Sequence, residues 1–352
     1  MKRSNKKRLQ KAASAAMVVA MAASSMSTAF AADASAGNAS AAKYNVIETE
    51  WGFNKVEQDG GKTLSYSPES GLTLLEDDGF AFKDLNKNGT LDTYEDWRLT
   101  TEERAAALAD MMVADGREGI ESIAGLMLYS AHTAVQSETV SGTEIDSRAR
   151  TQDGTTTMDA ITENKLRHVL VTSIASPEVG AKWSNNLQSI VEGMDYGIPC
   201  NNSSDPRHTA KADSTEQYVA GESGTISQWP GTVGLAATYD PEIVKQYGNI
   251  VGIEYRALGI GTALSPQIDL ASEPRWSRVN GTFGDNVKLT VDLSRAVVDG
   301  YQSTYDEEGN DLGWGSESIV AMIKHWPSGG PEEGGRDGHY GFGKYAVYPG
   351  ND

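Results

Sequence analysis

The segment VLVTSIASPEVGAKWSNNLQSIVEGMDYGIPC, residues 169–200, carries the pattern that decides the fold. It begins with a short β-branched run. Ser176-Pro177-Glu178 then supplies an N-cap, a proline at the first helical position and a first-turn acid. Apolar residues recur at helical spacing from Val179 to Met194, and a second apolar run follows at 198–200. Strand, helix and strand in this order predict a parallel βαβ unit and an α/β fold.

The alternation of strand and helix continues through most of the chain. Helices are predicted to begin near Thr101 and Asp240 and to cover 286–296, where Val287, Val291 and Leu293 are the candidates to face inward. Short apolar runs predict further strands at 123–128, 235–237, 260–264 and 319–323. This pattern suits either a barrel or a doubly wound sheet.

The polar stretch 130–165 is too long for a simple connection and is predicted to be a functional or mobile loop. Five or six strands are counted where a closed barrel takes eight. The run 319–323 is apolar throughout and carries no proline or charge, so we expect it to leave an edge that is prone to aggregation.

Composition and charge exclude several classes of protein. The 30 Lys and Arg residues are outnumbered by 49 Asp and Glu residues, which gives a formal charge of −19, and no basic patch occurs beyond residue 11. Nucleic acid is therefore not an expected partner. The single cysteine, Cys200, cannot form an internal disulfide, and the five histidines show no zinc-ligand spacing. No glycine-rich nucleotide motif and no serine-hydrolase elbow is present.

The first 31 residues have the pattern of a secretory signal peptide. A basic start is followed by small apolar residues from Ala12 to Ala23 and by the small-x-small cleavage pattern Ala29-Phe30-Ala31. The apolar run is shorter than a bilayer span, and no other segment is long enough to cross a membrane. We therefore expect a protein that is secreted or held in a bacterial cell envelope. Residues 32–98 are predicted to form an extension that begins with a linker and packs on a larger domain at 99–352.

Residues 84–95, DLNKNGTLDTYE, match the EF-hand calcium loop at each constrained position. Gly89 makes the sharp turn, and oxygens stand at the ligand positions in Asp84, Asn86, Asn88, Thr90, Asp92 and Glu95. The expected role of calcium is structural, clamping the extension onto the next helix. An ordinary Asx-rich turn before a helix is the alternative. No cofactor is expected for chemistry.

Polar clusters follow the predicted strands, at the positions where α/β folds carry their sites. They comprise 201–208, 265–278 and 324–327 with 336–339. Carboxylate, guanidinium, ammonium and imidazole groups beside tryptophans on one rim suit a neutral polyol, because charged groups bind hydroxyls and indole faces cover C–H patches. Scaffold ion pairing among the same charged residues is the alternative.

Four blocks, in order, resemble the N-terminal catalytic domain of family 3 glycoside hydrolases: WPGTVGLAATYDP at 229–241, EPRWSR at 273–278, TFGD at 282–285 and KHWP at 324–327. The likeness extends from about Asp96 to the C-terminus. It implies an incomplete TIM-like (β/α)8 barrel and retaining, exo-acting hydrolysis of terminal β-linked glucose or xylose from oligosaccharides. The chain departs from the family at Ser277, where glycine is usual, and at Asp285-Asn286, where Glu-Asp is usual.

The resemblance implies roles for single positions. Asp205 corresponds to the acid that binds outer sugar hydroxyls, and Arg278 corresponds to a substrate-contacting arginine. Lys324 and His325 correspond to a pair that holds hydroxyls of the same ring. Arg275 matches an arginine that we assign to scaffold ion pairing.

The resemblance places no catalytic residue firmly within the chain. The family's nucleophile is an aspartate some tens of residues beyond the Lys-His pair, and none of the 26 residues after Trp326 resembles its segment. We therefore expect the nucleophile beyond Asp352 and a truncated hydrolase that is inactive alone, because retaining chemistry needs two carboxyl groups. Alternatively, Asp337 and His339 match in part the acid/base dyad of the family's β-N-acetylglucosaminidases. A secreted, catalytically silent sugar-binding module is the third alternative.

Overall fold

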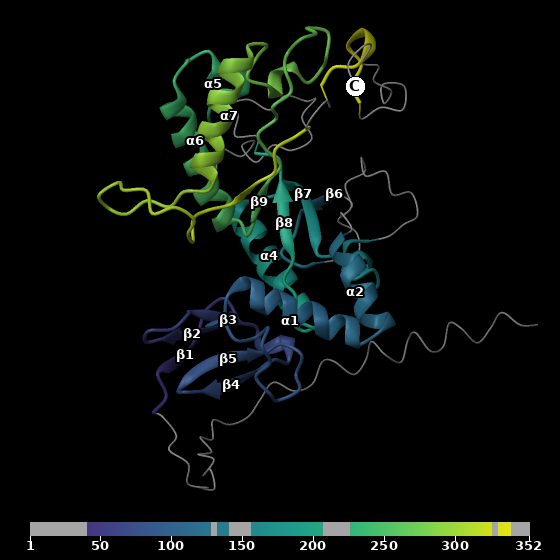
Figure 1. The fold of residues 1–352 in the computed structure, drawn as a ribbon, viewed down its shortest axis with the longest axis vertical. Helices are drawn as coiled ribbons and strands as arrows, with labels where there is room; N and C mark the ends of the chain where they lie inside the picture. The colour runs from purple at the N-terminus through teal and green to yellow at the C-terminus, as the bar shows by residue number, and fades with distance from the viewer. Residues whose placement is uncertain (1–40, 128–131, 141–155, 207–225, 326–329, 339–352) are drawn as a thin grey trace, which may run out of the picture. The chain divides into compact units, whose positions relative to one another are not determined.

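The main sheet of the structure has five parallel strands (Figure 1). The computed structural model describes residues 41–127, 132–140, 156–206, 226–325 and 330–338. In spatial order the strands are β10 (Val320–Ala321), β9 (Thr262–Ala263), β8 (Asn201–Ser204), β7 (His168–Ile174) and β6 (His132–Val135). Every pairing between neighbours in this sheet is parallel, so the carboxyl ends of its strands lie along one edge. The predicted α/β fold with a parallel sheet is confirmed.

Three long helices begin at the caps that the sequence predicts. At the start of α4 (Pro177–Glu192), the Ser176 hydroxyl accepts a hydrogen bond from the Val179 N–H at 3.2 Å. Asp240 and Asn286 cap α6 (Pro241–Ala257) and α7 (Val287–Tyr301) in the same way. These signals depend only on residues within one turn, so the sequence alone locates the helix starts.

Two glycines allow α6 and α7 to approach closely. A Cβ atom on Gly248 would lie 2.5 Å from the carbonyl oxygen of Val297, and a Cβ atom on Gly300 would lie 2.2 Å from that of Lys245. Both distances are too short for any side chain, and both clashes are with backbone atoms that cannot rotate away. The crossing of α6 and α7 therefore requires glycine at both positions.

The inward face predicted for α7 is confirmed at Leu293 and wrong at Val287 and Val291. Val287 and Val291 are 61% and 50% exposed, whereas Leu293 and Val297 are buried in the contact with neighbouring elements. Leu293 and Val297 are four residues apart and so lie on one face of the helix. The two valines were predicted to face inward from their apolar character alone. The buried residues Leu293 and Val297 show which face of the helix is turned to the core.

Two predicted strands are helical instead. The run 123–128 lies largely in α2 (Arg117–Met127), and the run 235–237 lies largely in α5 (Thr232–Ala236). Apolar runs of this length do not distinguish a strand from one buried side of a helix. The predicted loop at 130–165 contains β6 and α3 (Thr157–Thr162), while its described residues 136–140 lie in no helix or strand.

Residues 44–84 form two small antiparallel sheets. The first contains β1 (Tyr44–Glu48), β2 (Asn54–Gln58) and β3 (Leu64–Tyr66), and the second pairs β4 (Thr73–Asp77) with β5 (Phe80–Asp84). Lys83 on β5 forms an ion pair with Glu192 at the end of α4, and Glu192 also accepts the Ser67 N–H at 2.9 Å. The 84–95 loop follows, and then α1 (Thr101–Ala114) begins at a capping box formed by Thr100 and Glu103. The remaining short elements are the 3-10 turns η1 (Pro68–Ser70), η2 (Val279–Gly281) and η3 (Glu333–Gly335).

Two clusters of buried apolar side chains stabilise the fold around the sheet. One joins α5, α6, α7 and β9 and contains Tyr255 and Tyr301, and the other joins β6, β7, α3 and α4 and contains Trp183. None of the helices in the described ranges combines the length and hydropathy needed to cross a bilayer.

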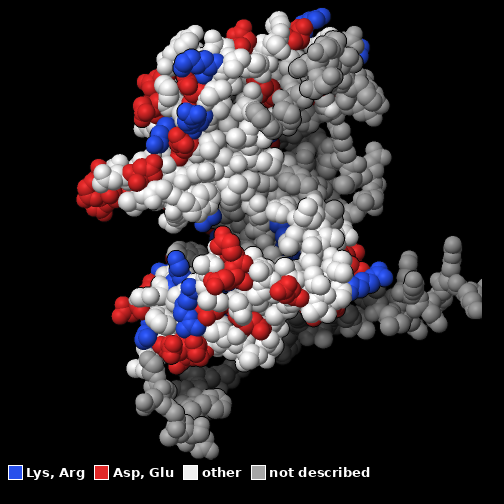
Figure 2. Space-filling view, in the orientation of Figure 1, with Lys and Arg blue, Asp and Glu red and all other residues white. Residues whose placement is uncertain are grey.

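Charged side chains of both signs are interspersed on the face shown in Figure 2. Acidic side chains gather on the protruding loop that follows α7, where residues 306–311 read DEEGND. Among the described residues on this face, Lys and Arg form no continuous basic surface. This distribution gives a polyanion no obvious place to bind on the visible face.

Candidate functional site

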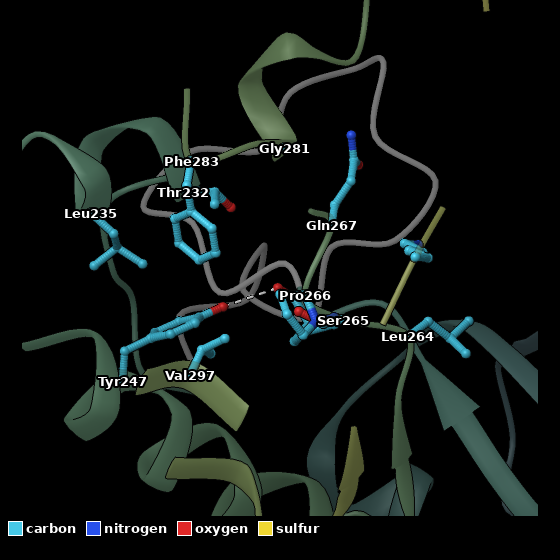
Figure 3. Close-up of a pocket in the computed structure, with 12 residues that line it drawn as sticks. Thr232, Leu235, Tyr247, Leu264, Ser265, Pro266, Gln267, Gly281, Phe283 and Val297 are labelled. Carbon is cyan, nitrogen blue, oxygen red and sulfur yellow. Dashed lines mark hydrogen bonds between the residues drawn. The ribbon is translucent and has the colours of Figure 1, made fainter. Parts of the chain in front are cut away.

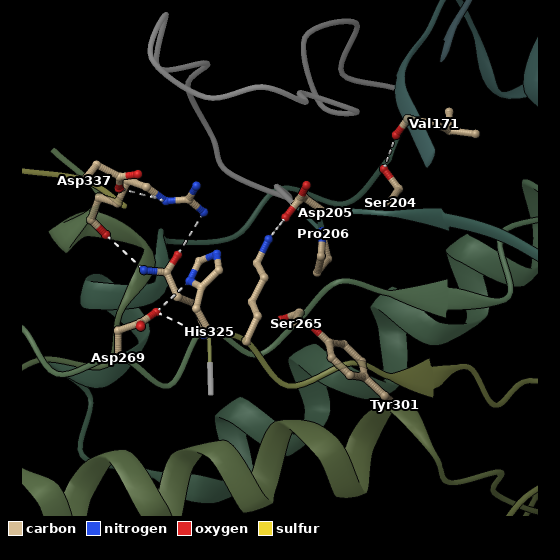
Figure 4. Close-up of polar contacts among 12 residues, drawn as sticks. Val171, Ser204, Asp205, Pro206, Ser265, Asp269, Tyr301, His325 and Asp337 are labelled. Carbon is tan, nitrogen blue, oxygen red and sulfur yellow. Dashed lines mark hydrogen bonds and ion pairs between the residues drawn. The ribbon is translucent and has the colours of Figure 1, made fainter. Parts of the chain in front are cut away.

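The candidate site lies at the carboxyl edge of the parallel sheet. Asp205 directly follows β8, the segment 265–269 follows β9, and Lys324 and His325 follow β10. Because β8, β9 and β10 are neighbours and parallel, these three strand ends lie side by side. Figure 4 shows their side chains converging from separate segments, as the sequence predicts.

Lys324 and Asp205 form a buried ion pair between Nζ and Oδ1. The two side chains are only 13% and 10% exposed. The backbone of Lys324 is fixed as well, since its N–H donates to the Pro266 carbonyl at 3.0 Å and its carbonyl accepts the Ile268 N–H at 2.7 Å. The ammonium group therefore has a defined position beside the sheet edge.

His325 is held by the carboxylate of Asp269. The distance from His325 Nδ1 to Asp269 Oδ2 is 2.9 Å, and the His325 backbone N–H approaches the same oxygen at 3.4 Å. The Asp269 side chain is 2% exposed, and that of His325 is 23% exposed. An ionised carboxylate can only accept hydrogen bonds, so with Asp269 ionised this contact requires the proton on Nδ1.

Arg278 is positioned by residues on both sides of it. Its terminal nitrogen donates to the side-chain oxygen of Gln267 at 3.3 Å, and its Nε lies 4.0 Å from Asp337 Oδ2. The same Asp337 oxygen accepts the indole N–H of Trp276 at 2.8 Å. Trp276 is 2% exposed, so it supports Asp337 and cannot cover a sugar ring, contrary to the expectation that tryptophans line the rim.

Arg275 forms a local ion pair, as expected for a scaffold residue. Its guanidinium donates to Glu273 at 2.7 Å, and this contact lowers the pKa of the Glu273 carboxyl to about 2. The Arg275 side chain is 70% exposed, and its described ion pair is with Glu273, two residues away.

A pocket of about 380 Å³, including open solvent, lies beside Lys324 (Figure 3). Its apolar lining comes from α5, α6, α7 and the segments after β9: Leu235, Tyr247, Leu264, Phe283 and Val297. Thr232, Ser265 and Gln267 add polar groups to the lining. The pocket therefore places apolar side chains beside Lys324 at the sheet edge.

The sequence matches a known family model over most of the region that builds this site. Residues 132–347 match the model of the N-terminal domain of glycosyl hydrolase family 3. The chain belongs to glycosyl hydrolase family 3. The family 3 resemblance drawn from the four sequence blocks is confirmed.

Relatives of this family 3 chain are longer than the chain itself. It is 38% identical over 287 residues to a periplasmic beta-glucosidase/beta-xylosidase of Dickeya chrysanthemi, covering 80% of this chain and 40% of the relative. It is 38% identical over 201 residues to beta-glucosidase C of Emericella nidulans, covering 56% of this chain and 31% of the relative. A solved β-glucosidase from Erythrobacter marinus is similar in structure, with 25% identity, a TM-score of 0.51, and coverage of 70% of this chain and 28% of that one. The chain thus spans less than half the length of each of these proteins.

The structure brings together four of the site residues expected in this family 3 domain: Asp205, Arg278, Lys324 and His325. Asp337 joins them through Arg278, whereas His339, the other half of the suggested dyad, lies outside the described residues. Sequence reasoning missed the roles of Asp269 and Gln267. Both stand in the polar segment after β9, which was singled out as a cluster, but their partners lie 56 and 11 residues away along the chain.

The 84–95 loop of this family 3 chain closes on its own side chains. Asp84 accepts the N–H groups of Asn88 and Gly89 at 3.0 Å each, and both asparagine side-chain amides donate to Asp92 at 2.7 Å. Glu95 accepts the Leu85 N–H at 2.7 Å, and burial raises the pKa of its carboxyl.

In the parts of the chain that the structure describes, no three His, Cys, Asp or Glu side chains converge as a metal-binding group. The donor set of the loop is nonetheless all oxygen, which is the chemistry that calcium prefers. Rotating the amides of Asn86 and Asn88 by a half turn would exchange their nitrogen and oxygen atoms. The amide oxygens of Asn86 and Asn88 would then face Asp92 and could serve with it as calcium ligands. The residues of the loop therefore fit calcium, and the site stays a prediction.

Proposed function

We propose that this chain forms the sugar-recognising part of an exo-acting, retaining glycoside hydrolase that removes terminal β-linked glucose or xylose from oligosaccharides. Family membership supports the reaction class. The observation that carries the proposal is the pair of side-chain contacts with carboxylates, Lys324–Asp205 and His325–Asp269, on adjacent strand ends. Such groups hydrogen-bond several hydroxyls of one neutral ring and hold it in a single orientation.

The described carboxylates of the site are suited to binding more than to bond cleavage. Asp205 is engaged by Lys324, Asp269 by His325, and Asp337 by the Trp276 indole N–H. A retaining mechanism needs two carboxyl groups about 5 to 5.5 Å apart, one attacking and the other protonating the leaving group. We therefore expect the 352-residue chain to bind sugar without turnover, as the sequence predicts. A catalytically silent sugar-binding module is the second candidate, and the same contacts favour it.

The contacts of Asp337 bear on the β-N-acetylglucosaminidase alternative. In that mechanism an aspartate orients a histidine, which acts as acid and base. Here the Asp337 carboxylate accepts from Trp276 and faces Arg278, so its described contacts give it a role in fixing the arginine. The glucose or xylose assignment is preferred on the names of the relatives, a beta-glucosidase/beta-xylosidase and a beta-glucosidase.

Sugar binding and turnover can be measured on the same sample. Titration with D-glucose, D-xylose and N-acetylglucosamine, followed by nuclear magnetic resonance, should give saturable shifts with the first two sugars, while p-nitrophenyl β-glucoside is not hydrolysed above the buffer rate. Arg275→Gln serves as the control, because Arg275 pairs only locally with Glu273 in the described contacts. Tight binding of N-acetylglucosamine alone would favour the other branch of the family. Steady turnover that is lost in Asp205→Ala would refute the assignment of the carboxylates to binding.

The organisation of the rest of the chain is also a proposal. The parallel sheet and its helices support part of a TIM-like (β/α)8 barrel over 99–352, and the small sheets of 44–84 support a separate extension within 32–98. Calcium bound by 84–95 would stiffen that extension, and Lys87 in the same loop already donates to the Gly193 carbonyl after α4 at 2.7 Å. Residues 1–31 are proposed to direct export to the medium or the cell envelope, in line with the periplasmic name of the Dickeya relative.

A further inference from the structure

Asp269 has the most deeply buried side chain of the three described site carboxylates, with 2% exposed, against 10% for Asp205 and 5% for Asp337. Its Oδ2 lies 2.9 Å from His325 Nδ1 and 3.4 Å from the His325 backbone nitrogen, so one carboxylate oxygen contacts both the ring and the backbone of His325. Asp269 follows β9 and His325 follows β10, so the contact also joins two neighbouring strand ends.

We propose that Asp269 is a positioning residue for sugar recognition, which fixes both the orientation and the tautomer of the His325 ring. The inference rests on the proposed function, because it assigns the ring to a sugar hydroxyl. With the Nδ1 proton directed at Asp269, the neutral imidazole has an acceptor at Nε2. A ring fixed in this way can accept a hydrogen bond from a hydroxyl of the same sugar ring that Lys324 approaches as a donor.

The geometry favours positioning over a purely structural role. A carboxylate this buried could have been satisfied by backbone N–H groups alone, yet its principal partner is a side chain that is itself 23% exposed. The Lys324–Asp205 pair differs from the His325–Asp269 pair in exposure. Both Lys324 and Asp205 are partly exposed, so both can reach a ligand. Asp269 is thus placed to act through His325, as outer carboxylates do for histidine ligands in metal sites.

The test compares two substitutions at Asp269 in the full 352-residue chain. In Asp269→Asn the side-chain oxygen can still accept a hydrogen bond from Nδ1, whereas Asp269→Leu removes the acceptor and keeps the branched shape of the side chain. Asp311→Asn is the matched control, since Asp311 accepts from Ser303 and Lys245 away from the site. The ¹⁵N spectrum of the His325 ring reports which nitrogen is protonated, and titration with D-glucose and D-xylose reports sugar affinity.

The parent chain and Asp269→Asn should show the neutral ring protonated at Nδ1, with sugar affinities within about threefold of each other. Asp269→Leu should lose the Nδ1 preference and bind sugar about tenfold more weakly, which corresponds to about 1.4 kcal/mol. Asp311→Asn should change neither quantity. If Asp269→Leu does not fold, Asp269→Ala takes its place, with the same result expected.

Two results would overturn the inference: an unchanged tautomer without the acceptor, or a changed tautomer with unchanged sugar affinity. If the parent chain binds neither sugar, the proposed function fails. The ¹⁵N spectra would then still decide whether Asp269 sets the tautomer, so the two failures are distinguishable.

Discussion

Breaking the Lys324–Asp205 pair should destabilise the protein strongly and in a non-additive way. Both side chains are about nine-tenths buried, so removing one leaves the other charge in a poorly solvated position. Losing one partner of a buried pair costs about 3–5 kcal/mol, and the residual exposure here points to the lower end, about 3 kcal/mol. We expect Asp205→Asn and Lys324→Met each to lower the free energy of unfolding by about that amount.

The assay is a double-mutant cycle followed by urea denaturation, with circular dichroism and tryptophan fluorescence as two probes. The double variant removes both charges of this pair, so it should be no less stable than either single variant. The control cycle uses Lys288→Met and Asp292→Asn on α7, an exposed pair four residues apart with side chains 85% and 40% exposed. Each control substitution should change stability by less than about 0.5 kcal/mol.

Additive losses in the Asp205 and Lys324 cycle would refute this reasoning. Additivity would mean that the two charges do not stabilise each other, and that each is held by separate groups. Losses as small as those of the Lys288 control would show that water reaches the pair freely. The polar cluster would then not be the preorganised site described here.

Two further predictions concern the loop and the sheet edge. Millimolar calcium should raise the melting temperature by binding the folded state, and Glu95→Gln should remove the shift; an unchanged melting curve for the parent chain would eliminate the 84–95 site. Met322→Lys should reduce concentration-dependent association in light scattering, because Val320, Met322 and Ile323 are 47%, 43% and 47% exposed at the β10 edge. A parent chain that is monomeric at all concentrations, with a sharp cooperative melt, would contradict the second prediction.

Local signals in the sequence predicted local structure well. The starts of α4 and α6 follow from Ser176-Pro177 and Asp240-Pro241, where cap and proline lie side by side. The runs at 123–128 and 235–237 were misassigned because a few apolar residues fit a buried helix side as well as a strand. Packing against distant residues decides between the two structures. In α2, for example, a Cβ atom on Gly125 would lie 2.3 Å from the Lys165 carbonyl oxygen, and the sequence gives no sign of this close contact.

The residues expected to touch the sugar could be predicted from the sequence, whereas the residues that hold them in place could not. Asp205, Lys324 and His325 were named from strand-end position and family blocks, and the structure brings them together. Asp269 was missed because its partner is 56 residues away, and nothing near it in the sequence marks it as the residue facing His325. Trp276 was placed on the rim from its residue type, and only its burial shows that its N–H serves Asp337.

The most direct test of the sugar site is the affinity of the 352-residue chain for D-glucose and D-xylose, measured by calorimetry for the parent and for Asp205→Asn. The account predicts saturable binding by the parent and a loss of at least about tenfold in Asp205→Asn, because the sugar would lose a charged acceptor and Lys324 its partner. A parent chain that binds neither sugar, or an Asp205→Asn variant that binds as tightly as the parent, would contradict the assignment of this sheet edge to sugar recognition.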